Sequence, residues 1–562
     1  MKRLYACILV LCCAALAAFA QKLPNSYGPR DFSWTDKNYE SYLERIETAT
    51  SISVKSVTRP RLVSNAFIEW SNTKRHWNEF GRESIRYRNQ LNARSRIIAG
   101  RAILRGNGSE ADAGPQGEWP IMLKQLYRDG YHFYSYSSEP EHFAFSVQPV
   151  YSFEIIETDD KRGKLSKFTG GFRVEAGYNS RLYGMVDFRD NTEAGNGPYE
   201  SRDDLYEDRW AAIELKGDGS ASYDVSESIL QYYGKNLAVS AGRGKHKWGP
   251  GHFGGLLLNN YAPPFDYARL DANFSRVNYT FLHGFLESVT PADTLYTNPD
   301  GRPRTINAQK YLSAQRIEVS PRNNVLLAFS QAVVYGDRGL QLGYLTPLNF
   351  LYSVQHSNDD KDNLLLSFDG KWRPTPGLKF YGEFLLDDVK VGDLFKGTGN
   401  SKNAYTLGVH GIVPREFWEK FDARFEYTKI RPFVYSHFFD VNTYSHWTSP
   451  LGYTREPNSE FISLRLGGTF YPLYVSIGYE RQNHGANTDD RNVGGSIQSG
   501  NYEGNKESFP FLDGRFERTE SIGMSARYEV LPNLNLLLAL NKISESRLPD
   551  RTEWKAGFGW NL

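Results

Sequence analysis

The chain has little cysteine and no long apolar segment after its first 20 residues. Its three cysteines, Cys7, Cys12 and Cys13, all lie in an N-terminal segment with the features of a signal peptide. The mature chain would therefore carry neither a disulfide nor a thiolate metal site. No later run reaches about 18 apolar residues, which excludes membrane-spanning helices. Basic and acidic residues nearly balance, at 66 against 65, so the charge does not indicate nucleic-acid binding.

The first 20 residues are typical of a secretory signal. Lys2 and Arg3 form its charged start, residues 4–16 its apolar stretch, and Ala18-Phe19-Ala20 its small-residue cleavage motif. We therefore expect export to the cell envelope, with cleavage near Ala20. Loss of the two basic residues changes the formal net charge from +1 to −1.

Aromatic residues are abundant in an otherwise polar chain. Phe, Tyr and Trp make up 14% of the residues, while the mean hydropathy is −0.54. Many segments alternate, as where the apolar residues at 522, 524, 526, 528 and 530 are separated by polar or small ones. An exported polar chain of this kind can cross a membrane as a closed antiparallel β-barrel. A secreted propeller or solenoid is the alternative, but the sequence has no fixed repeat period.

Strand counting supports the barrel. From about residue 140 we count about 18 candidate strands, an even number as in bacterial barrels. They include one strand from Asp208 and a single strand from Asp271. Tight turns such as 374–377 alternate with long connections such as 431–459, which is the pattern of periplasmic turns and outer loops.

The predicted fold is an all-β transmembrane antiparallel barrel with a small, partly helical N-terminal domain. The expected regions are a signal peptide at 1–20, a periplasmic domain at 21–137 and an outer-membrane barrel at 138–562. Within the periplasmic domain, residues 37–48 and 119–126 have the spacing of amphipathic helices.

Residues 241–270 differ from the rest of the chain. Six glycines and three prolines interrupt the alternation there. Trp248-Gly249-Pro250-Gly251 predicts a tight turn with one large aromatic anchor, and Pro263-Pro264 predicts a stiff exit. Arg243 and Asp266 bracket the segment and could pair across it. Strand counting places it between strands six and seven on the short-turn side, either as a plug in the lumen or docked on the periplasmic helices.

This segment resembles the signature of the capsule-assembly Wzi family of Gram-negative outer-membrane proteins. The matching residues are Gly242-Arg243, Trp248-Gly249-Pro250-Gly251, Leu256-Leu257-Leu258 and Ala262-Pro263-Pro264-Phe265-Asp266. A second block, 431–437 followed by 444–446, also matches. The resemblance implies a barrel that attaches surface or capsular polysaccharide to the cell. The other partners that we expect are outer-membrane lipid and lipopolysaccharide, and the capsule-export machinery is a further possible partner. We expect no nucleic-acid partner.

One predicted outer loop carries the residue types that a carbohydrate binder needs. Aromatic faces stack on sugar C–H surfaces, and a guanidinium can hold an acidic sugar carboxylate. The candidate residues are Arg431, Tyr435, His437, Tyr444, His446 and Trp447. The alternative interpretation is an aromatic girdle at the membrane boundary, or packing between loops.

Motifs for catalysis are missing from the sequence. It contains neither a Gly-x-Ser-x-Gly elbow nor a phosphate-binding loop, and His246 and His252 lack the spacing of metal ligands on a helix. We therefore predict no enzyme, no metal site and no cofactor. Three hypotheses remain: a lectin-like barrel, an oligosaccharide channel, or a barrel enzyme acting on lipid or glycan. Surface adhesion or gliding is a further role of some relatives. A plugged lumen would favour the lectin, and an open lumen the channel.

Overall fold

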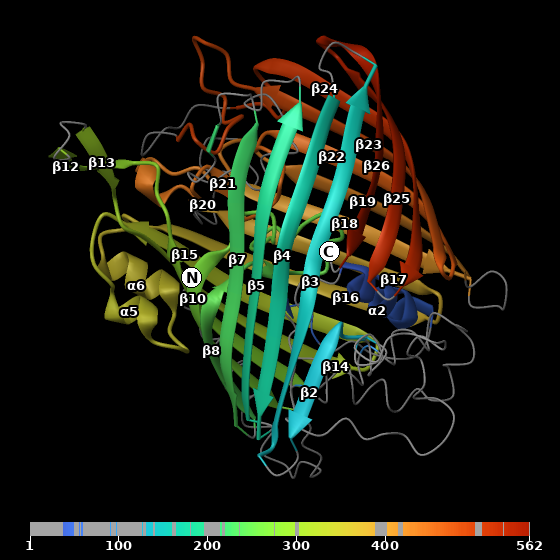
Figure 1. The fold of residues 1–562 in the computed structure, drawn as a ribbon. Coiled ribbons are helices and arrows are strands. Elements are labelled where there is room, and N and C mark those ends of the chain that lie inside the picture. Colours follow the sequence, from blue (N-terminus) through green and yellow to red (C-terminus); the bar gives the residue numbers. More distant parts are fainter. Residues whose placement is uncertain are drawn as a thin grey trace, which may run out of the picture.

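A computed structural model gives the fold (Figure 1). The residues that it describes are 37–49, 131–138, 141–159, 164–179, 181–195, 220–234, 236–274, 276–297, 303–387, 402–413, 420–500, 509–531 and 533–560, with short pieces at 56, 58–59, 90, 97, 126 and 214–215. In these parts of the chain, no helix is long and apolar enough to cross a membrane.

The chain forms a closed antiparallel β-barrel of 18 wall strands. In chain order the wall strands are β3 (Phe143–Thr158), β4 (Lys164–Tyr178), β5 (Leu182–Gly195), β7 (Ala221–Tyr233), β8 (Leu237–Gly244), β10 (Phe265–Phe274), β11 (Val277–Leu286), β14 (Lys310–Arg322), β15 (Val325–Gly336), β16 (Asn363–Thr375), β17 (Leu378–Asp387), β18 (Asn403–Ile412), β19 (Phe421–Ile430), β22 (Ser459–Phe470), β23 (Leu473–Ala486), β24 (Arg515–Leu531), β25 (Leu534–Glu545) and β26 (Leu548–Trp560).

The barrel closes between its first and last wall strands. β26 pairs with the upper part of β3, with Trp560 opposite Tyr151. A short preceding strand, β2 (Tyr134–Ser138), pairs with the lower part of β3, with Tyr134 opposite Val147. β26 and β2 therefore pair with the same edge of β3, one with its upper part and the other with its lower part.

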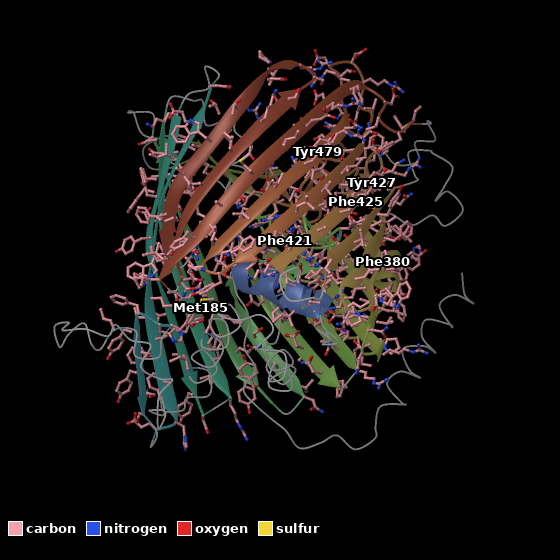
Figure 2. The ribbon with its side chains drawn as sticks, turned by 90° about the vertical axis from the view of Figure 1, so that its right-hand side faces the viewer. Met185, Phe380, Phe421, Phe425, Tyr427 and Tyr479 are labelled. Carbon is pink, nitrogen blue, oxygen red and sulfur yellow. The ribbon has the colours of Figure 1, made fainter. Side chains whose placement is uncertain are left out.

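The period-2 alternation sorts the wall into two faces. Outward positions expose apolar side chains, as where Leu536 and Leu538 of β25 are 49% and 62% exposed. Phe380 and Phe425, both labelled in Figure 2, belong to the same belt. Inward positions hold buried charges, such as Arg316, whose guanidinium donates to Asp369 at 2.6 and 2.8 Å. A closed ladder with an apolar outer belt and a polar interior is the form in which strands cross an outer membrane.

The total of 18 strands is confirmed, but two of the predicted strands were wrong and their errors cancelled. β5 pairs directly with β7, so the predicted strand from Asp208 is not a wall strand; the described part near it is β6 (Glu214–Leu215), which pairs with β7. The predicted strand from Asp271 is instead the hairpin of β10 and β11, joined between Phe274 and Val277.

This correction moves residues 245–264 to the other end of the barrel. They join the fifth wall strand, β8, to the sixth, β10, while the adjacent β7–β8 and β10–β11 connections are both short. The segment therefore leaves from the long-loop rim, which is the outer end, and not from the short-turn side. The predicted entry of this segment from the short-turn side is wrong, although it does contact the N-terminal part of the chain: Lys247 and Trp248 pair with Thr58 and Arg59, and His252 lies 3.9 Å from Glu44.

The predicted helix at 37–48 is confirmed as α2 (Lys37–Ala49). It lies against inward-facing residues near the short-turn end: Glu44 is 2.9 Å from Arg424 of β19, and the Thr48 hydroxyl is 2.9 Å from His410 of β18. Figure 2 shows α2 beside the start of β19, which Phe421 marks. Most of 21–137, including nearly all of the second predicted helix, lies outside the described residues, so the periplasmic domain stays a prediction.

Three connections at the long-loop rim carry further small elements. The β11–β14 connection holds the hairpin β12 (Pro291–Thr297) and β13 (Pro303–Asn307). The β15–β16 connection holds helices α5 (Leu342–Leu345) and α6 (Leu351–Ser357), on the outside of the barrel in Figure 1. The β19–β22 connection holds the 3-10 helix η6 (Asp440–Asn442) and the hairpin β20 (Ser445–His446) and β21 (Ser449–Pro450).

Candidate functional site

Residues 245–264, which we call the inner loop, turn from the outer rim into the lumen. Two carboxylates of the opposite wall hold its backbone. Glu383 of β17 accepts the backbone N–H of Gly251 at 2.8 Å and that of Leu256 at 2.7 Å. Buried backbone donors need such partners, because an unpaired one costs free energy. The wall thus supplies the acceptors that an irregular segment lacks.

The second carboxylate is Glu426 of β19. It accepts the backbone N–H groups of His252 at 2.7 Å and Phe253 at 3.3 Å, and also the Tyr381 hydroxyl at 2.8 Å. The His252 ring contacts the Arg424 guanidinium. Burial, reinforced by Arg424, lowers the pKa of His252 well below its ordinary value. The ring is therefore neutral and contributes packing and hydrogen bonding.

Glycine is required where the inner loop meets this wall. Gly249 has a φ of +113°, and a Cβ there would lie 2.4 Å from Glu383 Oε1. A Cβ on Gly251 would lie 2.1 Å from the backbone oxygen of Gly254. Gly242, still in β8, faces the backbone of β7, where a Cβ would lie 2.1 Å from Ser228 O. These signature glycines therefore allow close backbone approach.

Trp248 anchors the inner loop and is only 1% exposed. Its backbone N–H donates to Leu258 O at 3.0 Å, which closes the loop on itself. Lys247 and Trp248 form β9, which pairs with β1 (Thr58–Arg59) of the N-terminal segment. Lys247 Nζ donates to Gly251 O at 2.6 Å. The large ring and these bonds make the loop part of the barrel's core.

The ends of the inner loop are fixed at the outer rim. Arg243 of β8 and Asp266 of β10 are paired in register, and the guanidinium donates to the carboxylate at 3.0 Å. The predicted pairing of these two residues is confirmed. Pro263 and Pro264 are buried just before β10, whereas Pro250 at the loop's tip is partly exposed.

Residues 431–458, which we call the cap loop, fold over the inner loop. The Tyr435 hydroxyl donates to Leu256 O at 2.6 Å and accepts the Tyr453 N–H at 3.2 Å. The Tyr435 and Tyr444 rings stack with centroids 5.8 Å apart. Asp387, at the end of β17, accepts the Tyr435 N–H at 2.5 Å. Two loops from distant parts of the sequence thus pack into one seal.

His446 joins the cap loop to the rim of β11. Its Nδ1 accepts the Glu287 N–H at 2.9 Å, and the Trp447 N–H donates to Glu287 O at 2.9 Å. Burial, with smaller contributions from Arg243 and Lys310, lowers the pKa of His446 to about 3. The imidazole is therefore neutral at physiological pH and acts as a hydrogen-bond acceptor.

A third loop completes the seal from the β23–β24 connection. Gly494 O accepts the Phe433 N–H at 3.0 Å, and a Cβ on Gly494 would lie 2.5 Å from the Phe433 nitrogen. Ile497 is 1% exposed and packs in the same apolar cluster as Trp248 and Tyr435. Side chains of three rim loops therefore pack against one another at the outer end of the lumen.

Comparison with known proteins identifies the family. The family described as capsule assembly protein Wzi matches residues 154–548, which is more than half of the chain. The chain belongs to the Wzi capsule assembly family. No curated protein sequence matches it.

Solved structures of outer-membrane barrels are similar in outline. One is Escherichia coli Wzi, described as an outer-membrane protein involved in group 1 capsule assembly and a carbohydrate-binding β-barrel. It is 12% identical, the match covers 73% of this chain and 84% of that one, and the TM-score is 0.45. Pseudomonas aeruginosa OccK8 (OprE) is 10% identical over 74% of this chain and 97% of its own, with a TM-score of 0.42. Acinetobacter baumannii OccAB4 has the same identity and coverage, with a TM-score of 0.40.

The structure separates the predicted sugar-binding residues of this Wzi-family chain into groups. Tyr435 and Tyr444 lie together in the seal, both 0% exposed. His446 is buried beside Trp447, with ring centroids 6.4 Å apart, and Trp447 is partly exposed. The remaining two lie elsewhere in the cap loop. His437 is 3% exposed and stacks on Phe438, while the backbone N–H of Arg431 donates to Asn403 O at the top of β18.

Sequence reasoning missed two sets of residues. The first is Glu383 and Glu426, which stand at polar positions of alternating strands; nothing in the sequence indicates their bonds to the inner loop. The second is Phe438 and Phe439, whose rings lie 4.3 Å apart, with Phe439 44% exposed. The run of aromatics after His437 was a usable signal. In the described residues, no group of three or more His, Cys, Asp or Glu is placed to hold a metal.

Proposed function

We propose that this protein is a lectin-like barrel that attaches exported capsular or surface polysaccharide to the outer face of the cell. One observation carries the proposal: the rim loops that pack together at the outer end of the lumen also leave the aromatic rings of Trp447 and Phe439 accessible. A barrel sealed in this way is better suited to holding a large ligand at its surface than to passing it. Membership of the capsule assembly family supports the same conclusion.

The buried members of the predicted set have a supporting role in this proposal. Tyr435, Tyr444 and His446 fix the cap loop through the bonds described above, so they hold the surface in shape. The direct contacts fall to the partly exposed side chains, Trp447 and Phe439, because an aromatic face must be accessible to stack on a sugar. Arg431 remains a candidate for orienting an acidic sugar.

The experiment replaces the accessible rings. We expect the Trp447→Ala, Phe439→Ala double variant to fold, because outer loops contribute little to the strand ladder. Cell-associated polysaccharide should fall while released polysaccharide rises, since export itself is intact. Each lost ring removes about 1 kcal/mol of stacking, so attachment should weaken rather than vanish.

The matched control is Trp372→Ala, which removes an aromatic ring that is 51% exposed on the outer wall of β16, away from the rim. It should leave surface polysaccharide unchanged. If the double variant also keeps its polysaccharide at the wild-type level, these rings are not the binding surface.

The second candidate function is an oligosaccharide channel. The same seal argues against it, and conductance in a planar bilayer tests it directly. We expect the wild-type barrel to conduct poorly. A large steady conductance that oligosaccharides block would replace the lectin proposal with the channel. We propose no catalytic role.

A further inference from the structure

The outer wall of β14 and β15 has a polar patch where the rest of the belt is apolar. Outward positions in the upper half of these strands hold Ser313, Gln315 and Gln331. On β25, by comparison, Leu536, Leu538 and Leu540 occupy consecutive outward positions and are 41–62% exposed. Uncovered amides facing hydrocarbon would cost several kcal/mol each. This patch therefore needs a cover.

Residues 337–362, which we call the saddle, supply that cover. The segment leaves the rim at the end of β15, descends the outside of the barrel through α5, and returns through α6 (Figure 1). Gln331 Nε2 donates to Asn349 O at 2.7 Å, and Gln331 Oε1 accepts the Leu351 N–H at 3.2 Å. Ser313 Oγ donates to Tyr344 O at 2.7 Å. The patch thus binds the backbone of the saddle.

The deepest part of the saddle is fixed in the same way. The Tyr279 hydroxyl, on β11, accepts the Leu348 N–H at 3.0 Å and donates to Gln315 at 3.2 Å. Tyr344 and Leu351 are 0% exposed and pack on Tyr335 of the outer wall. The saddle is therefore docked along its length and not a loose loop.

The saddle's outward face repeats the chemistry of the lipid belt. Leu340, Leu342 and Leu348 are 47%, 81% and 70% exposed, values as high as those of the wall leucines. Acidic and basic residues lie near the two ends that join the rim: Asp337 and Arg338 at the first end, and Asp359 and Lys361, which pair at 3.3 Å, at the second. Leu348 lies in the deepest part of the saddle and the charged residues lie near the rim, which is the order that a membrane interface imposes.

Exposed hydroxyls of the saddle bond to their own helices. Thr346 Oγ1 donates to Leu342 O at 2.8 Å, and Ser357 Oγ donates to Ser353 O at 3.0 Å. Each hydroxyl therefore has a hydrogen-bond partner within the protein and does not need water. This allows these polar side chains to lie next to lipid.

We propose that the saddle is a lipid-facing element of the barrel, seated in the outer leaflet, and that Leu340, Leu342 and Leu348 contact acyl chains of the outer membrane. Three observations carry this: the polar patch that needs a cover, the bonds that hold the cover in place, and the continuity of its leucines with the apolar belt. Lipid is favoured over a protein partner because that belt surrounds the barrel on both sides of the saddle.

The test uses spin labels, because the chain from Gln21 onward has no cysteine and each introduced one is unique. Leu342→Cys and Leu348→Cys are labelled separately in the barrel reconstituted in lipid vesicles. Collision with oxygen, which concentrates in lipid, is compared with collision with a water-soluble nickel chelate. Leu327→Cys, on the wall of β15 and 55% exposed, is the lipid control. Asp359→Cys is the aqueous control.

We expect both saddle labels to collide with oxygen as often as the Leu327 control and to be protected from nickel, with Leu348 deeper than Leu342. Nickel collision equal to that at Asp359 would place the saddle in water and overturn the proposal. Protection from both reagents would mean that protein, such as a second copy of the chain, covers the leucines, and would also overturn it. All four labelled positions are exposed, and heat-modifiable migration checks that each variant has folded.

Discussion

The inner loop and the saddle leave the same rim of the barrel and end on opposite faces of its wall. Both are irregular, and both are held by side chains that bond to their backbone. The inner loop meets carboxylates, with Glu383 accepting two N–H groups at 2.8 and 2.7 Å. The saddle meets neutral amides and hydroxyls, with Gln331 bonding to Asn349 and Leu351. The same structural task is therefore done by different chemistry on the two faces.

The reason is the cost of burying charge. The lumen contains compensating charges, since Arg424 lies 2.9 Å from Glu44 and Arg316 lies 2.6 Å from Asp369, so a carboxylate there has charged partners within the protein. On the lipid face a carboxylate would lie next to hydrocarbon, where burial of an ion is far more costly than burial of an amide. Carboxylate acceptors therefore hold the loop that enters the polar lumen, and neutral amides and hydroxyls hold the loop that lies on the apolar outer face.

The largest effect is expected from Trp248→Ala on the inner side. The ring is 1% exposed, so its removal leaves a cavity that costs about 3–5 kcal/mol. We expect the inner loop to leave the lumen and the barrel to assemble poorly, measured as loss of heat-modifiable migration and a lower urea midpoint. Normal assembly with an unchanged midpoint would show that the ring is not an anchor.

Glu383→Gln removes one acceptor from the inner loop while keeping the side chain's size. Its amide nitrogen cannot accept, so either Gly251 or Leu256 loses its partner, at about 1–3 kcal/mol. We expect a higher conductance in planar bilayers, because the seal opens more often. Glu141→Gln, in an exposed position of the β2–β3 turn, is the control and should behave as wild type. Equal conductance in both variants would contradict the assigned role of Glu383.

Gln331→Leu makes the corresponding change on the outer side. It removes bonds to Asn349 and Leu351 but adds apolar surface, so we expect a smaller loss, about 1 kcal/mol. Proteolysis within 337–362 should become faster while conductance stays at the wild-type level. A rise in conductance would show that the saddle and the inner loop are coupled across the wall, and would contradict the view that each loop is held independently.

The smallest effect concerns pH. The pKa of His446 falls from its ordinary 6.5 to about 3 in the sealed state. Protonation therefore favours the open state, and the seal should weaken as pH falls from 6.5 toward 3 and be complete above that window. Conductance should rise over this range. His446→Asn keeps an acceptor near the Nδ1 position without titrating, so it should flatten the rise; an unchanged profile would assign the pH dependence to another group.

Much of the wall could be predicted from the sequence because it is local. The alternation at 522–530 and the helix at 37–48 need only neighbouring residues to be recognised. The hairpin of β10 and β11 was missed because the two strands are joined with no long turn between Phe274 and Val277. The segment from Asp208 was predicted to be a wall strand because alternation does not show which segments pair. Those two errors preserved the total but reversed the side assigned to the inner loop.

The candidate site was predicted less well than the wall. The aromatic and polar residues of 431–447 were identified correctly as one loop, and their sugar-binding role stays a prediction. Their burial could not be foreseen, because it depends on contacts such as Tyr435 with Leu256, 179 residues apart in sequence. Composition shows that a ring is present, but not whether it faces solvent or another loop.

By itself, the sequence determined the closed barrel, its even number of strands and its apolar and polar faces, because period-2 alternation is written into each strand. It also carried the family signature around Trp248. Only the tertiary structure decided that the inner loop enters the lumen from the outer rim and that the saddle descends the lipid face. Those directions depend on partners far apart in sequence, such as Gly251 and Glu383 at a separation of 132 residues, and no local pattern encodes them.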